Sequence, residues 1–287
     1  MIRKSKFAIV LRGNRIVYGV YLAIAAAMRL KRYRDITSYV VFIGYPRSGS
    51  SIVGSLLDAH KNIALSHELN ILNYHKKGYS RKQLLYLTER NAELSAKNNR
   101  ISSGYKGKVE GQFNGQVDTL LLLGDKKAGG TTKMLMHSPD LILELQKRLE
   151  LPVKALHCVR NPFDMITTQA YGGNEKKELL NAEKIQQSIA FFFEKADTVQ
   201  KIIDQGKNDV YTLRHEQLVA NSENELKALF DWLGIECEQE YLSACKDKLY
   251  MSPHKSRKTY NWSEEEVAVV EKRLKEYTFF SEYSFKD

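Results

Sequence analysis

Residues 40–55 constrain the fold of this chain more than any other stretch. Four consecutive apolar residues, 40–43, end at Gly44 and predict a short strand that is buried on both faces. An apolar-periodic helix begins at Ser51. The loop between them combines glycines, which allow close backbone approach, with the unpaired amides of a helix N-terminus. This strand, loop and helix predict a phosphate-binding site at residues 45–51.

The same alternation of strands and helices continues along the chain. Further buried strands are predicted at residues 153–159 and 209–213. Because Pro139 follows Ser138 and Pro162 follows Asn161, each pair predicts a helix start. The sequence therefore predicts an α/β fold with a P-loop-like parallel sheet that is flanked by helices on both faces. The predicted helices are residues 51–59, 81–97, 139–149, 162–171, 182–203, 223–233 and 263–276.

Residues 1–38 are predicted to form a separate N-terminal helical segment, followed by one domain at residues 39–287. The apolar run 16–28 has basic residues on both sides. A helix needs roughly 20 apolar residues to span a bilayer, so this run is too short for a simple transmembrane anchor. A packed or surface-lying helix, a short membrane anchor and a cleaved signal peptide remain open. We expect a cytoplasmic location, with peripheral membrane contact through residues 1–34 as an alternative.

Composition indicates which kind of partner the chain binds and in which redox state its cysteines are. The 44 basic and 34 acidic side chains leave a net charge of +10, which favours anionic partners. The three cysteines, Cys158, Cys237 and Cys245, have no paired spacing and predict buried thiols in a reducing compartment. No metal-ligand spacing is present either, so we expect no metal site.

The predicted phosphate loop departs from a nucleoside triphosphatase loop at one position. Gly44 and Gly49 have the spacing of a Walker A loop, yet Ser50 stands where that loop needs a lysine, and the cation is Arg47 instead. Without that lysine, kinase or ATPase chemistry is disfavoured. A purely structural turn remains the alternative at this stage.

Two motifs together resemble a known family. The loop at residues 46–51 has the order proline, arginine, serine, glycine and two serines, and residues 159–164 place Arg160 directly after a predicted strand, with Thr168 further on. This pattern resembles sulfotransferases that use 3′-phosphoadenosine 5′-phosphosulfate, and is closest to the bacterial and tyrosylprotein branch. The resemblance implies that Arg160 and Thr168 bind the 3′-phosphate. It also implies a 5′-phosphosulfate loop formed by Arg47, Ser48, Gly49, Ser50 and Ser51.

The resemblance also suggests catalytic groups. Sulfuryl transfer needs a base for the acceptor and cations for the leaving oxygen. Glu68 stands at the place of the proposed glutamate base of tyrosylprotein sulfotransferases, and His67 is the competing candidate. Lys126, in a segment expected to be a flexible basic turn, matches the active-site lysine of the family, with Lys127 and Lys133 as alternatives. Arg47 would share the developing charge.

Three further residues are weaker candidates for donor binding. Arg214 lies in a strand and helix element that resembles the adenine-binding element of the family, where His215 replaces the usual tyrosine. Ser256 and Arg257 lie in a basic segment that resembles the loop closing over the donor. The glycine-rich stretch 102–115 is interpreted as a surface loop, either a substrate-facing lid or a plain connector.

The expected function is sulfuryl transfer from 3′-phosphoadenosine 5′-phosphosulfate to a hydroxyl or amine of an acceptor that the sequence does not identify. A carbohydrate, a peptide or a small molecule would fit; nucleic acid is not expected. The alternatives are a P-loop kinase or nucleotide-binding protein without sulfuryl transfer, and a basic membrane- or polyanion-binding protein on the same fold.

Overall fold

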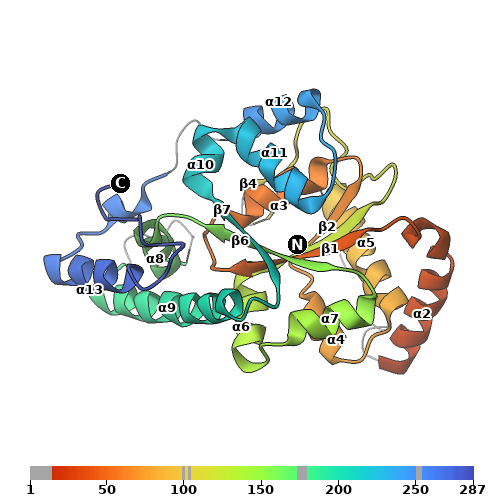
Figure 1. Ribbon diagram of the computed structural model, residues 1–287, viewed down its shortest axis with the longest axis horizontal. Helices are drawn as coiled ribbons and strands as arrows, with labels where there is room; N and C mark the ends of the chain where they lie inside the picture. Colours follow the sequence, from red (N-terminus) through yellow and green to blue (C-terminus); the bar gives the residue numbers. More distant parts are fainter. Residues whose placement is uncertain (1–14, 99–100, 103–104, 173–179, 250–253) are drawn as a thin grey trace. The chain divides into compact units, whose positions relative to one another are not determined.

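The computed structural model describes residues 15–98, 101–102, 105–172, 180–249 and 254–287 (Figure 1). They form two compact units. Unit 1 comprises the described residues up to Val40 together with Ser51–Lys127 and Asp140–Val153, and unit 2 comprises Val41–Ser50, Ala128–Pro139 and Lys154–Asp287. The chain passes from one unit to the other at Ser50–Ser51, within the loop predicted to bind phosphate.

The main sheet has five strands in the order β2-β5-β1-β6-β7. Strands β2 and β5 pair in parallel in unit 1, and β6 and β7 pair in parallel in unit 2. The predicted α/β fold with a parallel sheet is therefore confirmed. The strands are β1 (Ser38–Gly44), β2 (Ile63–His67), β5 (Leu122–Lys126), β6 (Val153–Val159) and β7 (Asp209–Arg214).

In unit 1, helices cover both faces of the sheet. Side chains alternate along a strand, and a Cβ at Gly54 of α3 (Ser50–Ala59) would lie 3.0 Å from the Lys126 side chain and 3.2 Å from that of Leu65. On β1, the Tyr39 hydroxyl lies 2.9 Å from Thr88 Oγ1 of α5 (Arg81–Lys97). Helix α3 thus approaches the strands so closely that glycine at position 54 avoids a tight contact.

The N-terminal helix α2 (Arg15–Ala27) packs on α5 through one face, where Leu22 and Ala26 are fully buried. Arg29, just after α2, pairs with Glu89 and Glu93 of α5 at 2.8 and 2.6 Å. Among the described residues, no helix is both long and apolar enough to cross a membrane. The remaining elements of unit 1 are η1 (Leu30–Tyr33), α4 (Ile71–Lys76), α7 (Leu141–Leu149) and the two-residue strands β3 (Ile101–Ser102) and β4 (Tyr105–Lys106).

Unit 2 is built on the long helix α9 (Ala182–Asp204), which packs against α6 (Ala128–His137) and α8 (Pro162–Ala170). An aromatic cluster fills its core, in which Tyr45 packs against Phe192 and Phe280 with ring centroids 4.9 and 5.3 Å apart. The other elements are α10 (His215–Ala220), α11 (Ser222–Leu233), α12 (Gln239–Lys248), η3 (Ser256–Thr259) and α13 (Glu264–Leu274).

Two helix starts were predicted from a capping residue followed by a proline. The start at Asn161–Pro162 is confirmed, because the Asn161 side chain accepts a hydrogen bond from the Phe163 amide and Pro162 opens α8. The start at Ser138–Pro139 is wrong. Residues 139 and 140 form a turn and α7 begins at Leu141.

Two further sequence predictions are wrong in part. The flexible turn predicted at residues 124–130 is instead the end of strand β5 followed by helix α6, whose first turn contains Gly129 and Gly130. A Cβ at Gly129 would lie 2.9 Å from the Pro46 ring, so close packing explains that glycine. Among the cysteines, Cys158 and Cys245 are buried as expected, whereas Cys237 is partly exposed.

Candidate functional site

The predicted phosphate loop is a tight turn between β1 and α3. Gly44 and Gly49 adopt φ values of +113° and +86°, and Arg47 also has a left-handed φ of +67°. Inside the loop, the Ser48 hydroxyl donates to the Tyr45 carbonyl at 3.0 Å. Because α3 begins at Ser50, its first amides have no acceptor within the helix and face an anion favourably.

Gly49 is packed directly against the His215 ring. A Cβ at Gly49 would lie only 2.7 Å from His215 Nδ1, so this position requires glycine for space as well as for its φ. Burial, together with the nearby Arg160 charge, lowers the pKa of His215 to about 4. The imidazole is therefore neutral at pH 7 and has one donor and one acceptor nitrogen.

Arg160 follows β6, as the sequence predicts, and is held by the protein on one side. Its Nη2 lies 3.8 Å from Asp164 Oδ2 and donates to the His254 carbonyl. Its Nε is buried and has no hydrogen-bond partner among the described residues. The guanidinium is thus positioned by Asp164 while one donor is left for another group.

Thr168 and His215, like Arg160, each have a buried polar atom without a hydrogen-bond partner among the described residues. Thr168 lies one helical turn beyond Asp164 on α8, and residues four apart on a helix are neighbours. In the described part of the chain, neither Thr168 Oγ1 nor His215 Nδ1 has a hydrogen-bond partner. Buried polar groups normally have partners, so unpaired atoms of three neighbouring motifs of unit 2 fit the binding of a polar, anionic ligand.

Arg257, Ser256 and Arg214 are engaged with other protein groups. Arg257 is 3% exposed, and its Nη1 lies 2.7 Å from Asp164 Oδ2 while its amide donates to Asp164 Oδ1 at 2.8 Å. Ser256 Oγ lies 3.0 Å from His254 Nδ1. Arg214 pairs with Glu282 at 3.5 Å. Arg257 and Asp164 therefore form a buried pair that braces the segment after residue 253 against α8.

Arg47, the predicted loop cation, points its guanidinium at the end of α8. Its Nη2 donates to the Gly172 carbonyl at 2.9 Å. This contact lies within unit 2, as do all the predicted donor-binding residues except Ser51, the first residue of unit 1 after the loop.

Unit 1 contributes a compact charged cluster. Lys126 Nζ donates to Glu68 Oε1 at 2.7 Å and to Ser51 Oγ at 3.1 Å, and Lys127 Nζ donates to Glu68 Oε2 at 2.5 Å. The Glu68 amide donates to the Lys126 carbonyl at 3.0 Å. The structure thus brings together the predicted base, the predicted cation and the end of the phosphate loop.

The protonation of this cluster follows from its surroundings. Burial by itself raises the pKa of Glu68, but the ammonium groups of Lys126 and Lys127 outweigh it and hold that pKa below its ordinary value. Burial lowers the pKa of Lys126, and the Glu68 carboxylate opposes this effect. A carboxylate and an ammonium therefore coexist near neutral pH, with the lysine easier to deprotonate than a surface lysine.

His67 is the competing candidate for the base, and Lys133 is a competing candidate for the cation. The His67 amide donates to the Asn91 side chain at 2.9 Å, and the pairing of His67 with Lys126 is through the β2–β5 ladder. Lys133 is exposed on α6, in unit 2. Of the three candidate lysines, Lys126 and Lys127 both contact the Glu68 carboxylate directly.

Within the loop at residues 102–115, two backbone amides bond to the C-terminal end of α3. The Phe113 amide donates to the Ala59 carbonyl at 3.0 Å and the Gly115 amide to the Asp58 carbonyl at 2.7 Å, so the loop meets the C-terminal end of α3. Helix α3 is ten residues long, from Ser50 to Ala59, which is about 15 Å. These two bonds attach residues 113 and 115 to the end of α3 that is opposite to the phosphate loop.

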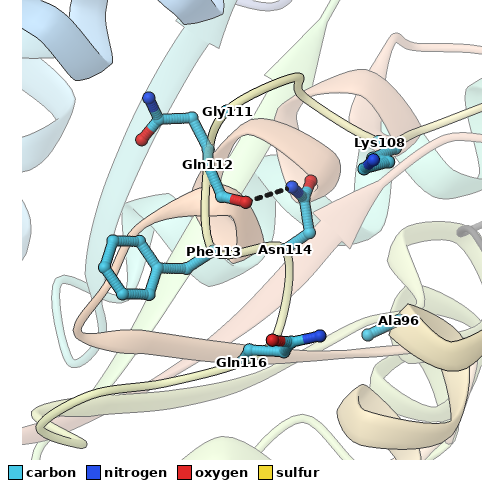
Figure 2. Close-up of a pocket in the computed structure, with 7 residues that line it drawn as sticks. All are labelled: Ala96, Lys108, Gly111, Gln112, Phe113, Asn114 and Gln116. Carbon is cyan, nitrogen blue, oxygen red and sulfur yellow. Dashed lines mark hydrogen bonds between the residues drawn. The ribbon is translucent and has the colours of Figure 1, made fainter.

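Figure 2 shows a pocket of about 480 Å³ within this loop, where the Asn114 side chain is tied to the Gln112 carbonyl. Asn114 also bonds both backbone groups of Val109. These bonds stabilise the turn itself.

Two residues of the charged cluster were missed from the sequence. Asp125 is fully buried beside Lys126 and accepts three hydrogen bonds. Gly54 leaves room for the Lys126 side chain against α3. The sequence signal for Asp125 was an acidic residue at the end of an apolar run. For Gly54 it was a glycine inside an apolar helix.

Several solved structures are similar to this chain. The sulfotransferase domain from the curacin biosynthetic pathway is 16% identical, with a TM-score of 0.49 over 84% of this chain and 98% of that one. Sulfotransferase STF9 from Mycobacterium avium is 10% identical, with a TM-score of 0.49 over 90% and 81% of the two chains. Mouse sulfotransferase SULT7A1 complexed with PAP is 13% identical, with a TM-score of 0.41 over 82% and 73%.

No curated protein matches the sequence at a significant level. The model of the sulfotransferase family matches residues 40–239, which include the phosphate loop, the Glu68 and Lys126 cluster and Arg160. Since the match covers more than half of the chain, this protein belongs to the sulfotransferase family.

Proposed function

We propose that this sulfotransferase transfers the sulfuryl group of 3′-phosphoadenosine 5′-phosphosulfate to a hydroxyl or amine of its acceptor, with Glu68 as the base. The observation that carries the proposal is the Lys126 ammonium, which contacts both Glu68 and Ser51, the last residue of the phosphate loop. A base, a cation and an anion-binding loop are the groups that sulfuryl transfer needs.

On the donor side, the phosphate loop Arg47, Ser48, Gly49, Ser50 and Ser51 binds the 5′-phosphosulfate in this proposal. Arg160 and Thr168 bind the 3′-phosphate, and their unpaired buried atoms support that role. Arg257 contributes indirectly, because it braces Asp164, which in turn positions Arg160. Arg214 and Ser256 are further donor-binding residues in this proposal. Residues 39–287 act as one sulfotransferase domain.

The reaction is an in-line displacement at sulfur. The acceptor oxygen or nitrogen attacks the sulfur, its proton passes to Glu68, and the bond between sulfur and the bridging phosphate oxygen breaks. The Lys126 ammonium and the Arg47 guanidinium stabilise the negative charge that develops on the leaving phosphate. The lowered pKa of Glu68 keeps it deprotonated and ready to accept a proton, at the expense of some basicity.

The acceptor is to be found by direct transfer. The full chain is incubated with ³⁵S-labelled donor and separate carbohydrate, peptide and lipid acceptors, with Glu68→Gln as the matched control. We expect label on one acceptor class with the unaltered chain and a strong loss with Glu68→Gln. Equal labelling by both chains would contradict the role of Glu68. A chain that binds adenosine nucleotides but labels none of the three classes would support the alternative, a nucleotide-binding protein without sulfuryl transfer.

We also propose a peripheral membrane contact through the segment 1–34. Helix α2 and the residues just after it expose six large apolar side chains, of which Met28 is 84% and Ile24 61% exposed. Residues 1–34 contain nine basic and no acidic residues. An apolar helix face beside basic residues fits the interface of an anionic bilayer. The six are Val17, Val20, Tyr21, Ile24, Met28 and Leu30.

A further inference from the structure

Asp125 is a buried carboxylate directly before the lysine of the charged cluster. It is 1% exposed and stands opposite Ser66 in the parallel ladder of β2 and β5. The Ser66 hydroxyl donates to Asp125 Oδ1 at 2.7 Å. A buried charge is costly without such bonds, so its presence needs a reason beyond packing.

The remaining bonds of Asp125 hold the segment that follows Glu68. The Leu69 amide donates to Oδ1 at 3.1 Å and the Ile71 amide to Oδ2 at 2.9 Å. Ile71 is the first residue of α4, and the side chain of its N-cap residue Asn70 makes no capping bond. Asp125, on strand β5, therefore accepts one of the first amides of α4, which have no acceptor within the helix.

The backbone held in this way is an unusual one. Glu68 and Asn70 have φ values of +60° and +64°, a region that side-chain-bearing residues rarely adopt and that persists only where surrounding bonds impose it. The Glu68 amide is bound by the Lys126 carbonyl at 3.0 Å, and the Leu69 amide by Asp125. Two successive residues of β5 thus fix two successive amides, and this turn directs the Glu68 side chain to the Lys126 ammonium.

Asp125 also acts on Lys126 through its charge. Alternation along β5 places the two side chains on opposite faces, with Lys126 towards α3. The charged groups that influence the Lys126 ammonium are Glu68 and Asp125, which favour its protonated form, and Lys127, which opposes it. Neutralising Asp125 would remove one of the two negative charges that keep Lys126 charged.

We propose that Asp125 is a positioning residue, which fixes the turn of Glu68 with two amide bonds and supports the charged form of Lys126 by its own negative charge. The roles of Glu68 and Lys126 in this inference rest on the proposed function. The contacts of Asp125 do not depend on it.

The test is the titration of Lys126 followed by NMR in protein with labelled lysine, with the Lys126 signal assigned by its loss in Lys126→Arg. In Asp125→Asn, the titration midpoint of Lys126 is expected to fall by ~0.5 pH unit or more. Ser66→Ala is the matched control, because it removes one bond to Asp125 and keeps the charge; its midpoint is expected to move less. An unchanged midpoint in Asp125→Asn would overturn the electrostatic role.

A second measurement needs no variant at position 125, should Asp125→Asn fail to fold. The three hydrogen bonds that Asp125 makes with described residues all come from donors and stabilise its charged form, whereas burial and the Glu68 charge raise its pKa. The ¹³C shift of its carboxyl carbon at pH 7 is expected to be that of a carboxylate. The shift of a protonated acid would overturn the proposal.

Turnover then separates this inference from the proposed function. Asp125→Asn is expected to lower kcat about 10-fold or more, with the affinity for 3′-phosphoadenosine 5′-phosphate unchanged. Full turnover in Glu68→Gln would contradict the role of Glu68 as base while the lysine titration still decides whether Asp125 acts on Lys126. Loss of turnover in Glu68→Gln with unaltered kcat in Asp125→Asn would overturn the positioning role alone.

Discussion

Lys126 Nζ lies 2.7 Å from Glu68 Oε1, and the same ammonium lies 3.1 Å from Ser51 Oγ, in the first turn of α3. One cation therefore contacts both a carboxylate and the helix start that follows the phosphate loop. Gly54 provides the room for this arrangement, since a Cβ there would lie 3.0 Å from Lys126 Cγ. The predictions below follow from this pairing and from the unpaired atoms of unit 2.

Glu68→Gln removes the proposed base but keeps the size of the side chain. We expect kcat to fall by about 10²–10⁴-fold, the usual contribution of a general base, with donor binding unchanged. Steady-state kinetics with an identified acceptor and calorimetry with 3′-phosphoadenosine 5′-phosphate measure the two quantities. Glu110→Gln, at an exposed glutamate of unit 1, is the matched control. A variant that keeps wild-type kcat excludes Glu68 as the base.

Lys127→Met shifts the pH dependence of turnover. The proposed reaction needs Glu68 deprotonated and Lys126 protonated, so activity rises as pH passes the pKa of Glu68 and falls as it passes that of Lys126. The Lys127 charge lowers both pKa values. Removing it is expected to move both limbs of the pH–rate profile to higher pH.

Lys133→Met is the control for this shift, since Lys133 is an exposed lysine on α6. Its pH–rate profile is expected to match that of the unaltered chain. If Lys133→Met moves the limbs and Lys127→Met does not, Lys127 does not act on Glu68 and Lys126 as the geometry indicates.

Arg160→Ala weakens donor binding. Loss of a charge-assisted bond to a phosphate is expected to cost about 1.5–3 kcal/mol, roughly 10- to 150-fold in Kd. Calorimetry with 3′-phosphoadenosine 5′-phosphate measures this, and Lys258→Ala, at an exposed cation of η3, is the matched control. Equal affinities of Arg160→Ala and the unaltered chain would refute the 3′-phosphate site.

The exposed face of α2 predicts binding to anionic lipid. Co-sedimentation with vesicles of phosphatidylcholine and phosphatidylserine is expected to exceed that with phosphatidylcholine alone, and to weaken with salt. Ile24→Ser with Met28→Ser is expected to reduce it, since each removes an exposed apolar side chain. Val269→Ser is the matched control, because Val269 is 50% exposed on α13.

Two outcomes would contradict the membrane contact. Equal sedimentation of the double variant and the Val269→Ser control would mean that the α2 face does not bind lipid. Concentration-dependent dimerisation that is lost in the double variant, without any lipid binding, would assign the face to a second copy of the chain.

The fold could be predicted where sequence periodicity and local caps agree with the tertiary structure. Strand β6 and helix α5 begin and end where predicted, because each is bounded by its own local signals. Strands β2 and β5 were not predicted, since each is only five residues long and ends in polar residues that belong to the charged cluster. The two glycines of the first turn of α6 likewise gave a turn signal that close packing on Pro46 overrides.

The candidate site could be predicted only as separate motifs. Spacing from the loop suggested Glu68, and similarity to a family segment suggested Lys126, but their contact depends on the pairing of β2 with β5. Asp125 could not be recognised, because its role depends on three donors that lie 54 to 59 residues earlier in the chain. The attachment of Arg257 to Asp164 is a tertiary contact of the same kind, across 93 residues.

The most direct test of sulfuryl-donor use is thermal stabilisation by nucleotides. A ligand at 100 times its Kd stabilises the folded state by about 2.7 kcal/mol, so binding is visible as a rise in Tm. We expect 3′-phosphoadenosine 5′-phosphate to raise the Tm of the unaltered chain, with a smaller rise in Arg160→Ala, and ATP with Mg²⁺ to raise it little. Stabilisation by ATP with Mg²⁺ but not by 3′-phosphoadenosine 5′-phosphate would contradict the proposed donor.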